Sequence, residues 1–192
     1  SIPCSPEDDY TPPYSYDVEK AKAYLEQYKA ETGVSSVDIS ILAPDTAMYL
    51  YPAITVEGML REVGFNVTTE QIDRSTYWSS VYAGNYQLAV TGTSWPVNDC
   101  DGNYLYFYST SGQHYFMAFN KDMDKILDEA RVTSDPAARK QCYTEVQKII
   151  DDEAICVPLL QPANAVAYNA DLKGVDKQND IYCHFVYDWS WQ

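Results

Sequence analysis

Between residues 17 and 91 the sequence alternates three times between a helical pattern and a strand pattern. In the helical segments apolar residues recur every three or four positions, and in the strand segments β-branched residues alternate with polar ones. The expected helices are 18–32, 47–63 and 76–83, and the expected strands are 37–42, 65–70 and 86–91. Helices that alternate with strands form a mainly parallel sheet with helices on its faces. We therefore expect an α/β protein of this kind.

Several helix boundaries are marked by residues with special backbone or capping properties. Asp17 is placed to cap the first helix, and Gly33 to end it in a left-handed conformation. Asp73 or Ser75 caps the third helix. Pro52 must lie in the first turn of the second helix or kink it, because proline has no N–H to donate inside a helix.

After residue 100 the pattern becomes mainly helical. Residues 104–108 indicate one helical turn, and Asn120 and Pro136 mark the starts of two longer helices. The residues expected to face inward from these two helices are Met123, Ile126, Leu127, Ala130, Ala138, Cys142, Val146, Ile149 and Ile150. Segments 155–160 and 163–168 are strand-like, but Pro158 restricts the first to an edge or an end of a sheet.

A polar loop, residues 92–103, follows the third expected strand. Right-handed crossovers would place the carboxyl ends of all three strands at one edge of the sheet, where ligands bind in open α/β folds. Asp45, Asp73 and Trp95 would then share one rim. Trp95 could stack on a ligand, and Ser94, Asn98 and Asp99 could bind its polar groups. The alternative is that Trp95 packs on the end of the sheet and that the polar side chains are solvated.

Length and charge exclude several classes of function. The 192 residues suit one domain with a full core. A formal net charge of −15 repels nucleic acid and anionic membranes, so neither is an expected partner. No apolar stretch approaches the roughly 18 residues that span a bilayer. No signal peptide begins the sequence, so we expect Ser1 to be an artificial start or a cut within a longer polypeptide.

The residues that usually carry catalysis or bind cofactors are scarce. The two histidines, His114 and His184, have no nucleophile motif beside them, and no phosphate-binding glycine motif occurs. Asp99, Asp101 and Asn103 alternate like the start of a calcium loop, but its later ligands are missing. We therefore expect no enzyme, no cofactor and no metal; a hydrolase would need a nucleophile and a base near the loop.

The five cysteines lack Cys-x-x-Cys spacing, which argues against zinc and redox motifs. Cys142 is expected on the inward face of a helix, and Cys156 in an apolar strand, so both are interpreted as small core residues. Cys100 and Cys183 lie beside polar loops and could form a disulfide if the protein is exported.

Five stretches, in the same order along the chain, resemble the C-terminal part of the family 5 extracellular solute-binding proteins, which serve ABC importers. They are YDVEKAKAYL at 16–25, MLREVGFNV at 59–67, YAGNYQLAVTG at 82–92, LDEAR at 127–131 with Asp135, Pro136 and Arg139, and VPLL at 157–160. Each stretch alone is weak, and the ordered set is specific.

The resemblance implies a two-lobed fold that closes on its ligand, of which this chain would be the C-terminal lobe. Residues 1–16 would be an extended arm or linker, 17–171 the ligand-binding lobe, and 172–192 a segment that returns to the missing N-terminal lobe. Apolar surface would then be exposed around Phe185, Trp189 and Trp191, unless these residues fold back.

It further implies an extracytoplasmic protein, periplasmic or lipid-anchored, that binds a solute without catalysis. The expected partners are a peptide or other small-molecule ligand, the N-terminal lobe of the same protein and an ABC-transporter permease. The expected ligand-binding residues are Ser94, Trp95, Asn98, Asp99, Asp45, His114 and Tyr115.

The loop departs from the family pattern GW-x-x-D-Y, in which the aspartate of peptide binders holds the ligand's α-ammonium group. Here residues 93–97 read TSWPV, so the acid is out of register, and Asp99 could replace it only with a changed loop path. A sugar or a metal chelate is therefore an alternative to a peptide, and a sensor or interaction domain that reuses this lobe is an alternative to a transport receptor.

Overall fold

The computed structural model describes residues 10–93, 99–112, 116–160, 167–175, 187 and 189–191 of the chain. The chain divides into two compact units, Ser1–Val157 (unit 1) and Pro158–Gln192 (unit 2). These units are defined by how compactly the chain packs and do not test the boundaries expected from the sequence. The boundaries after residues 16 and 171 stay predictions.

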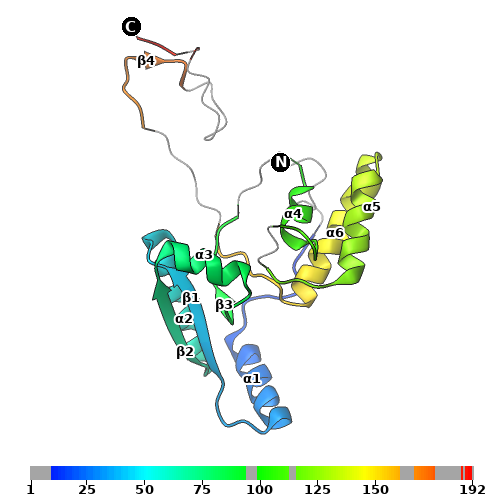
Figure 1. Cartoon of the computed structure of the whole chain (residues 1–192). Helices are drawn as coiled ribbons and strands as arrows, with labels where there is room; N and C mark the ends of the chain where they lie inside the picture. Colours follow the sequence, from blue (N-terminus) through cyan, green and yellow to red (C-terminus); the bar gives the residue numbers. More distant parts are fainter. Residues whose placement is uncertain are drawn as a thin grey trace. The chain divides into compact units, whose positions relative to one another are not determined.

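Unit 1 contains a parallel sheet whose central strand is β1 (Asp38–Pro44). Strand β2 (Asn66–Ile72) pairs with β1 along its whole length, from Asp38 opposite Asn66 to Pro44 opposite Ile72. Strand β3 (Leu88–Ala89) pairs with the other side of β1, which gives the order β2-β1-β3 (Figure 1). The expected α/β fold with a parallel sheet is confirmed, although the paired part of β3 is shorter than the expected strand 86–91.

A helix precedes each of these strands, and the three helices begin and end near the expected residues. They are α1 (Val18–Thr32), α2 (Ala47–Val63) and α3 (Arg74–Tyr82). The Asp17 carboxylate accepts the N–H of Lys20 at 2.9 Å, and Gly33 ends α1 with a φ of 74°. The Asp73 carboxylate accepts the N–H of Ser75 at 3.0 Å, so Asp73 rather than Ser75 caps α3.

Pro52 lies in the interior of α2, five residues after its first residue, Ala47, which excludes the first turn, one of the two expected alternatives. At this position the proline leaves the carbonyl of Met48 without its usual helical donor. Met48 is exposed, with 59% of its surface accessible, so water can satisfy that carbonyl and the helix tolerates the proline.

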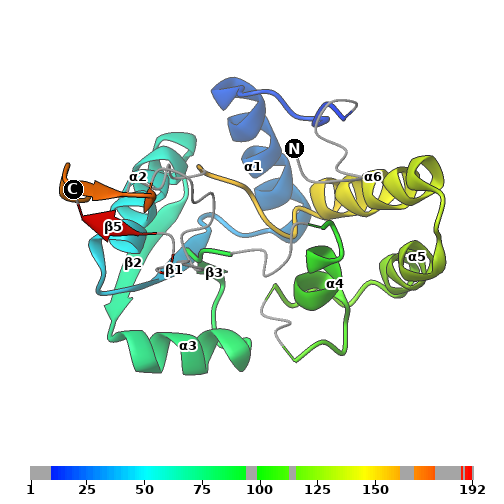
Figure 2. The same cartoon turned by 90° about the horizontal axis from the view of Figure 1, so that it is seen from above.

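The rest of unit 1 is helical: α4 (Gly102–Phe107), α5 (Lys121–Val132) and α6 (Pro136–Asp152). Asn120 caps α5 and Asp135 caps α6, and the two helices pack side by side (Figure 2). The inward face of α6 is partly different from the expected one, since Ala138 is exposed and Tyr143 is buried. Arg139 rather than Ala138 turns toward α5 in the first turn of α6, where its Nε donates to the carbonyl of Ala130 at 3.1 Å.

One continuous core joins the sheet to α5 and α6. Its buried members include Leu42, Tyr77, Val81, Tyr106, Phe107, Met123, Leu127, Tyr143, Val146 and Ile150. A smaller cluster of Ile41, Ala43, Ala53 and Val67 lies where the sheet and α2 pack together. Cys142 is buried in the larger core, as expected.

The strand expected at 155–160 is absent: these residues are irregular, and Val157, Leu159 and Leu160 are 73%, 50% and 68% exposed. A β-propensity pattern becomes a strand only when a neighbouring strand pairs with it. Cys156 is accordingly half-buried outside any strand. Residues 163–166 of the other expected strand lie outside the described residues.

The described part of unit 2 contains two short antiparallel strands, β4 (Leu172–Lys173) and β5 (Ser190–Trp191). Trp191 is 70% exposed, whereas Trp189 is half-buried; Phe185 and Cys183 lie outside the described residues. None of the helices in the described ranges is long and apolar enough to cross a membrane.

Leu127→Ala is expected to lower the free energy of unfolding by roughly 2–5 kcal/mol, because Leu127 is 1% exposed and its truncation leaves a cavity in the larger core. Urea unfolding followed by circular dichroism measures the change. Val132→Ala, on the same helix at 85% exposure, is the control and should change stability by less than about 0.5 kcal/mol. Equal effects of the two substitutions would contradict the proposed core.

Candidate functional site

The carboxyl ends of β1 and β2 meet at one edge of the sheet. Pro44 and Ile72 are paired, and the next residue after Pro44, Asp45, donates its N–H to the carbonyl of Ile72 at 2.9 Å. Asp73 follows Ile72 directly and caps α3. The expected rim is therefore confirmed for Asp45 and Asp73, whereas Trp95 lies outside the described residues.

Two tyrosines hold the start of the polar loop. Tyr77 is buried in the core, and its hydroxyl donates to the carbonyl of Val90 at 2.8 Å; burial raises the pKa of Tyr77 to about 12. Tyr49 approaches Gly92 so closely that a Cβ at this glycine would lie 3.3 Å from the ring and the hydroxyl. Gly92 therefore allows Tyr49 of α2 to pack against the loop, whereas a larger residue at position 92 would push the Tyr49 ring away.

A bidentate ion pair holds the other end of the loop. Arg139 donates from Nη1 and Nη2 to the two carboxylate oxygens of Asp99, each at 2.7 Å. The same guanidinium bonds to the Tyr143 hydroxyl at 3.0 Å and to the Ala130 carbonyl at 3.1 Å, so its position on α6 is fixed. The hydrogen bonds from Arg139 hold the pKa of the Asp99 carboxyl below its usual range.

A second bidentate pair lies two residues further along. Arg131 donates to the Asp101 carboxylate at 2.7 and 2.8 Å, and its guanidinium lies 3.5 Å from the centre of the Tyr104 ring. Tyr104 in turn stacks on Tyr108, with ring centres 4.1 Å apart. The two arginines come from α5 and α6, so these helices fix the second half of the loop.

These pairs explain why Asp99 and Asp101 alternate in the sequence without forming a calcium loop. Both carboxylates face guanidinium groups, which supply the compensating charge. Across the described ranges, no group of three or more His, Cys, Asp or Glu side chains could hold a metal ion.

Most of the expected ligand-binding residues lie outside the described residues: Ser94, Trp95, Asn98, His114 and Tyr115. Of the other two, Asp45 is exposed at the rim, and Asp99 is bound to Arg139. Their roles in ligand binding stay predictions. Tyr49, Tyr77, Arg131 and Arg139 were not predicted as anchors of the loop. The hydrogen bonds of the last three span 13, 30 and 40 positions, and contacts over such separations leave no local pattern.

A buried carboxylate, Asp124, anchors the segment between α4 and α5. It accepts the N–H of Ser109 at 2.8 Å, the Ser109 hydroxyl, and Lys121 Nζ at 3.0 Å. Burial alone would raise the pKa of Asp124, but these hydrogen bonds and the Lys121 charge outweigh burial and hold the pKa below its usual range. Lys121 Nζ also donates to Ser109 Oγ at 2.8 Å.

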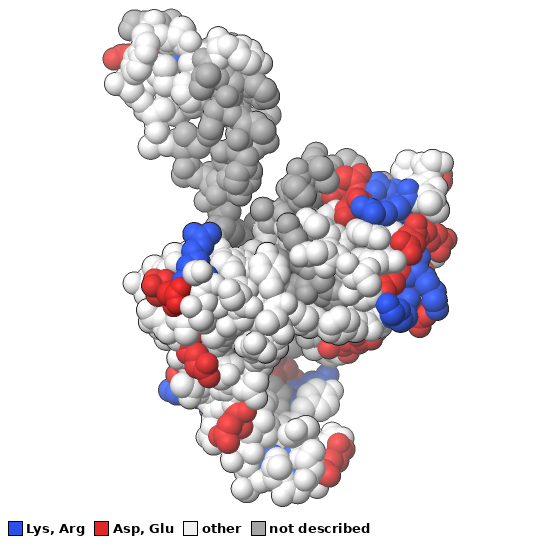
Figure 3. Space-filling model, in the orientation of Figure 1, with Lys and Arg blue, Asp and Glu red and all other residues white. Residues whose placement is uncertain are grey.

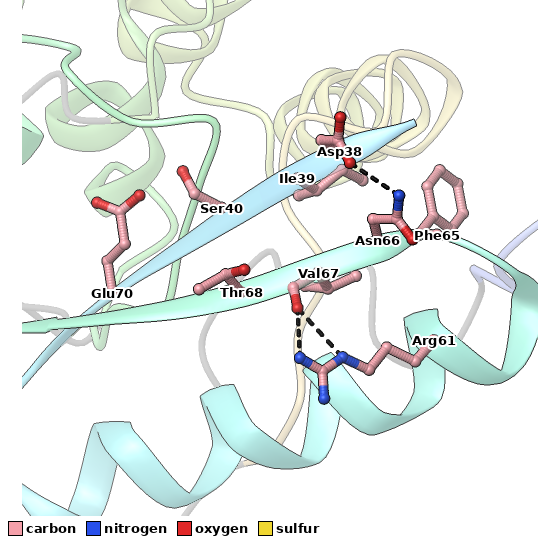
Figure 4. Close-up of a pocket in the computed structure, with 9 residues that line it drawn as sticks. All are labelled: Asp38, Ile39, Ser40, Arg61, Phe65, Asn66, Val67, Thr68 and Glu70. Atoms are coloured by element: carbon pink, nitrogen blue, oxygen red, sulfur yellow. Dashed lines mark hydrogen bonds between the residues drawn. The ribbon is translucent and has the colours of Figure 1, made fainter. Parts of the chain in front are cut away.

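A hollow of about 550 Å³ lies along β1 and β2 from their amino ends (Figure 4). It is lined by Asp38, Ile39, Ser40, Arg61, Phe65, Asn66, Val67, Thr68 and Glu70. Asp38 accepts a hydrogen bond from Asn66 Nδ2 at 2.9 Å at the start of both strands. The hollow therefore begins at the end of the sheet opposite to Asp45 and Asp73, and it is distinct from the rim.

Charge on the visible face of the described structure is mixed. Figure 3 shows acidic and basic side chains interspersed over α5. One ion pair of this helix is Asp122–Lys125, with Lys125 Nζ 2.6 Å from Asp122 Oδ1. No basic patch appears on this face among the described residues.

The sequence model of the bacterial extracellular solute-binding proteins, family 5 Middle, matches residues 3–132. A probable D,D-dipeptide-binding periplasmic protein of Escherichia coli, DdpA, is 27% identical over 84% of this chain and 31% of its own length. Di/tripeptide-binding protein 4 of Pseudomonas aeruginosa is 23% identical over 78% of this chain and 29% of its own length. The chain spans about a third of the length of these curated relatives.

Among solved structures, the periplasmic binding protein DppA from Helicobacter pylori, in complex with the peptide STSA, matches with a TM-score of 0.74. It is 24% identical, and the match covers 85% of this chain and 32% of that one. At this identity the likeness shows the fold alone: the α/β arrangement described above matches a part of that protein's fold.

Arg139→Met is expected to lower the free energy of unfolding by about 2 kcal/mol, because it leaves the part-buried Asp99 carboxylate without its charged donor. Urea unfolding measures the loss. Lys125→Met, which breaks the fully exposed pair with Asp122, is the matched control and should cost less than about 0.5 kcal/mol. If both substitutions cost the same, the Asp99–Arg139 pair does not anchor the loop.

Acid should destabilise the protein through Asp99 and Asp124. A carboxyl group whose pKa is lowered by folding contributes stability that is present above its unfolded pKa, near 4, and lost as the pH falls through its folded pKa. The free energy of unfolding should therefore stay level from about pH 7 to 5 and decline below about pH 4. Asp99→Asn should lower stability at pH 7 and make the acid decline shallower; an unchanged decline would rule out Asp99 as a contributor.

Proposed function

Because this chain belongs to the bacterial extracellular solute-binding proteins of family 5, we propose that it is the C-terminal ligand-binding lobe of an extracytoplasmic receptor for peptides or similar small solutes. The observation that carries the proposal is the match of the family model to residues 3–132, more than half of the chain. The parallel sheet supports it, since open α/β sheets bind ligands outside the carboxyl ends of their strands.

Binding in this proposal takes place at the rim of the sheet. Asp45 is exposed there, and the polar loop begins at the neighbouring strand β3. We assign the ligand contacts to Ser94, Trp95, Asn98 and Asp99 of the loop, to Asp45, and to His114 and Tyr115. Trp95 would supply a stacking face, and the polar side chains would bind the ligand's polar groups.

Asp45 is a better candidate than Asp99 for a positively charged ligand group. Both oxygens of Asp99 accept hydrogen bonds from Arg139, and Oδ1 also accepts the N–H of Asp101 at 2.8 Å. Recruiting Asp99 would leave the Arg139 guanidinium without its carboxylate partner, which is costly for a half-buried charge. The exposed Asp45 carboxylate can bind a ligand without such a loss.

The names of the relatives support a peptide as the ligand class. A D,D-dipeptide-binding protein and a di/tripeptide-binding protein are among them. A sugar or a metal chelate is the alternative ligand class, because residues 93–97 depart from the family pattern.

The family consists of binding proteins, and we propose that this chain likewise performs no covalent chemistry. Affinity would come from closure of a second, N-terminal lobe of the same full-length protein over the rim, which requires the ligand to bind the closed state more tightly than the open one. The receptor would lie in the periplasm or be lipid-anchored at the cell surface. It would then deliver its solute to an ABC-transporter permease.

Asp45→Asn in the full-length protein is expected to weaken the binding of short peptides by about tenfold or more, the effect of losing a charged hydrogen-bond acceptor. Calorimetric titration with di- and tripeptides measures it. Asp38→Asn, at the opposite end of the same strand, is the matched control and should leave affinity unchanged. The 192-residue chain alone should bind weakly, because it desolvates the ligand on one side only.

Two results would count against this proposal. Equal losses in the Asp38 and Asp45 variants would remove the rim as the binding site. The second result is a full-length protein that binds no peptide but carries a sugar or a metal chelate after purification from its host, as native mass spectrometry would detect. The protein would then still be a solute receptor, but its ligand would not be a peptide.

A further inference from the structure

Strand β2 is an edge strand of the parallel sheet in the part of the chain that the structure describes. In a parallel strand, successive residues direct their N–H and C=O groups to opposite sides. Asn66 donates its N–H toward the β1 side, to the carbonyl of Val37 at 2.9 Å, and Ile72 accepts from Asp45 on the same side. The intervening residues Val67 and Thr69 therefore direct their peptide groups outward, away from β1.

Two side chains of α2 bond to these outward groups. Arg61 donates from Nη2 and Nε to the carbonyl of Val67, at 2.7 and 3.1 Å (Figure 4). Glu57 Oε2 accepts the N–H of Thr69 at 3.0 Å and the Thr69 hydroxyl at 2.5 Å. Arg61 and Glu57 also pair with each other, with Nη2 and Oε1 2.7 Å apart.

This arrangement reproduces the bonds that one residue of a neighbouring parallel strand would make. Such a residue gives its N–H to one carbonyl and accepts an N–H two residues further along the same strand. Arg61 supplies the donor for Val67, Glu57 supplies the acceptor for Thr69, and their ion pair joins donor to acceptor.

We propose that the Glu57–Arg61 pair closes the β2 edge to strand addition, and that the partner it excludes is β2 of a second copy of this chain. The β2 segment is NVTTEQI, in which Val67, Thr68, Thr69 and Ile72 are β-branched and favour strands. Unprotected edges of this kind template pairing with another chain. The β2 edges of two copies of this chain can pair as antiparallel strands related by a two-fold axis, so a second copy is a sufficient partner.

Other features of the edge do not close it by themselves. Glu70 adds a negative charge, but its side chain does not occupy the outward peptide groups of Val67 and Thr69. The hollow beside Arg61 leaves open space along Asn66 and Thr68 into which a neighbouring chain could approach.

The test compares the self-association of the chain with that of Glu57→Ala/Arg61→Ala. The double substitution keeps the formal net charge at −15, because it removes one acid and one base. The expected result is a dimer whose dissociation constant, measured by analytical ultracentrifugation, is at least about tenfold lower than that of the unsubstituted chain. The control is Glu19→Ala/Lys22→Ala, which removes an exposed ion pair of α1 and also leaves the net charge unchanged. It should not change self-association.

A charge-swapped variant, Glu57→Arg/Arg61→Glu, separates edge closure from helix stability. It keeps an ion pair with the same spacing on α2 but presents an acceptor to the Val67 carbonyl and a donor to the Thr69 N–H. It should associate like the double alanine variant if the edge bonds matter. Association at the level of the unsubstituted chain would overturn the proposal.

Amide hydrogen exchange provides a measurement that does not depend on the folding of the double variants. In the unsubstituted chain at low concentration, the Thr69 amide should be protected by a factor of about ten relative to the same amide in Glu57→Gln, which weakens the acceptor. Equal exchange rates in the two proteins would show that the edge bond is not formed in solution and would likewise overturn the proposal.

Discussion

Parallel pairing on both sides of β1 is the constraint on which the rest of unit 1 depends. Parallel neighbours cannot be joined by tight turns, so each connection must be a crossover, and here each crossover is a helix. The crossovers also bring the carboxyl ends of the strands to one edge, where Asp45, Asp73 and the polar loop leave the sheet. The position of the candidate site is therefore a consequence of strand direction rather than of any single contact.

The helices α5 and α6 complete this arrangement by a different interaction. Arg131 and Arg139, which belong to the stretches that resemble the family, each bind a carboxylate in the second half of the loop. The structure thus gives these two residues a role in holding the loop. The residues that carry the resemblance to the family are therefore different from the residues proposed to contact the ligand.

Local patterns predicted most of unit 1. Capping residues such as Asp17, Asp73 and Asn120 act within three or four positions, so their effects can be inferred from neighbouring letters. The strand at 155–160 was wrong because a strand needs a partner, which its own sequence does not contain. The Asp99–Arg139 pair was missed for the same reason: its members lie 40 positions apart, and Asp99 taken alone has the character of a ligand-binding acid.

The two anchors of the polar loop have a consequence for how such a protein can evolve. Tyr49 and Tyr77 fix the chain as far as Gly92, and Arg139 fixes it again from Asp99. Substitutions between these points leave the residues that make the anchoring contacts unchanged. A departure from the family pattern at residues 93–97 can therefore be inherited together with both anchors, because it changes none of the residues that form them.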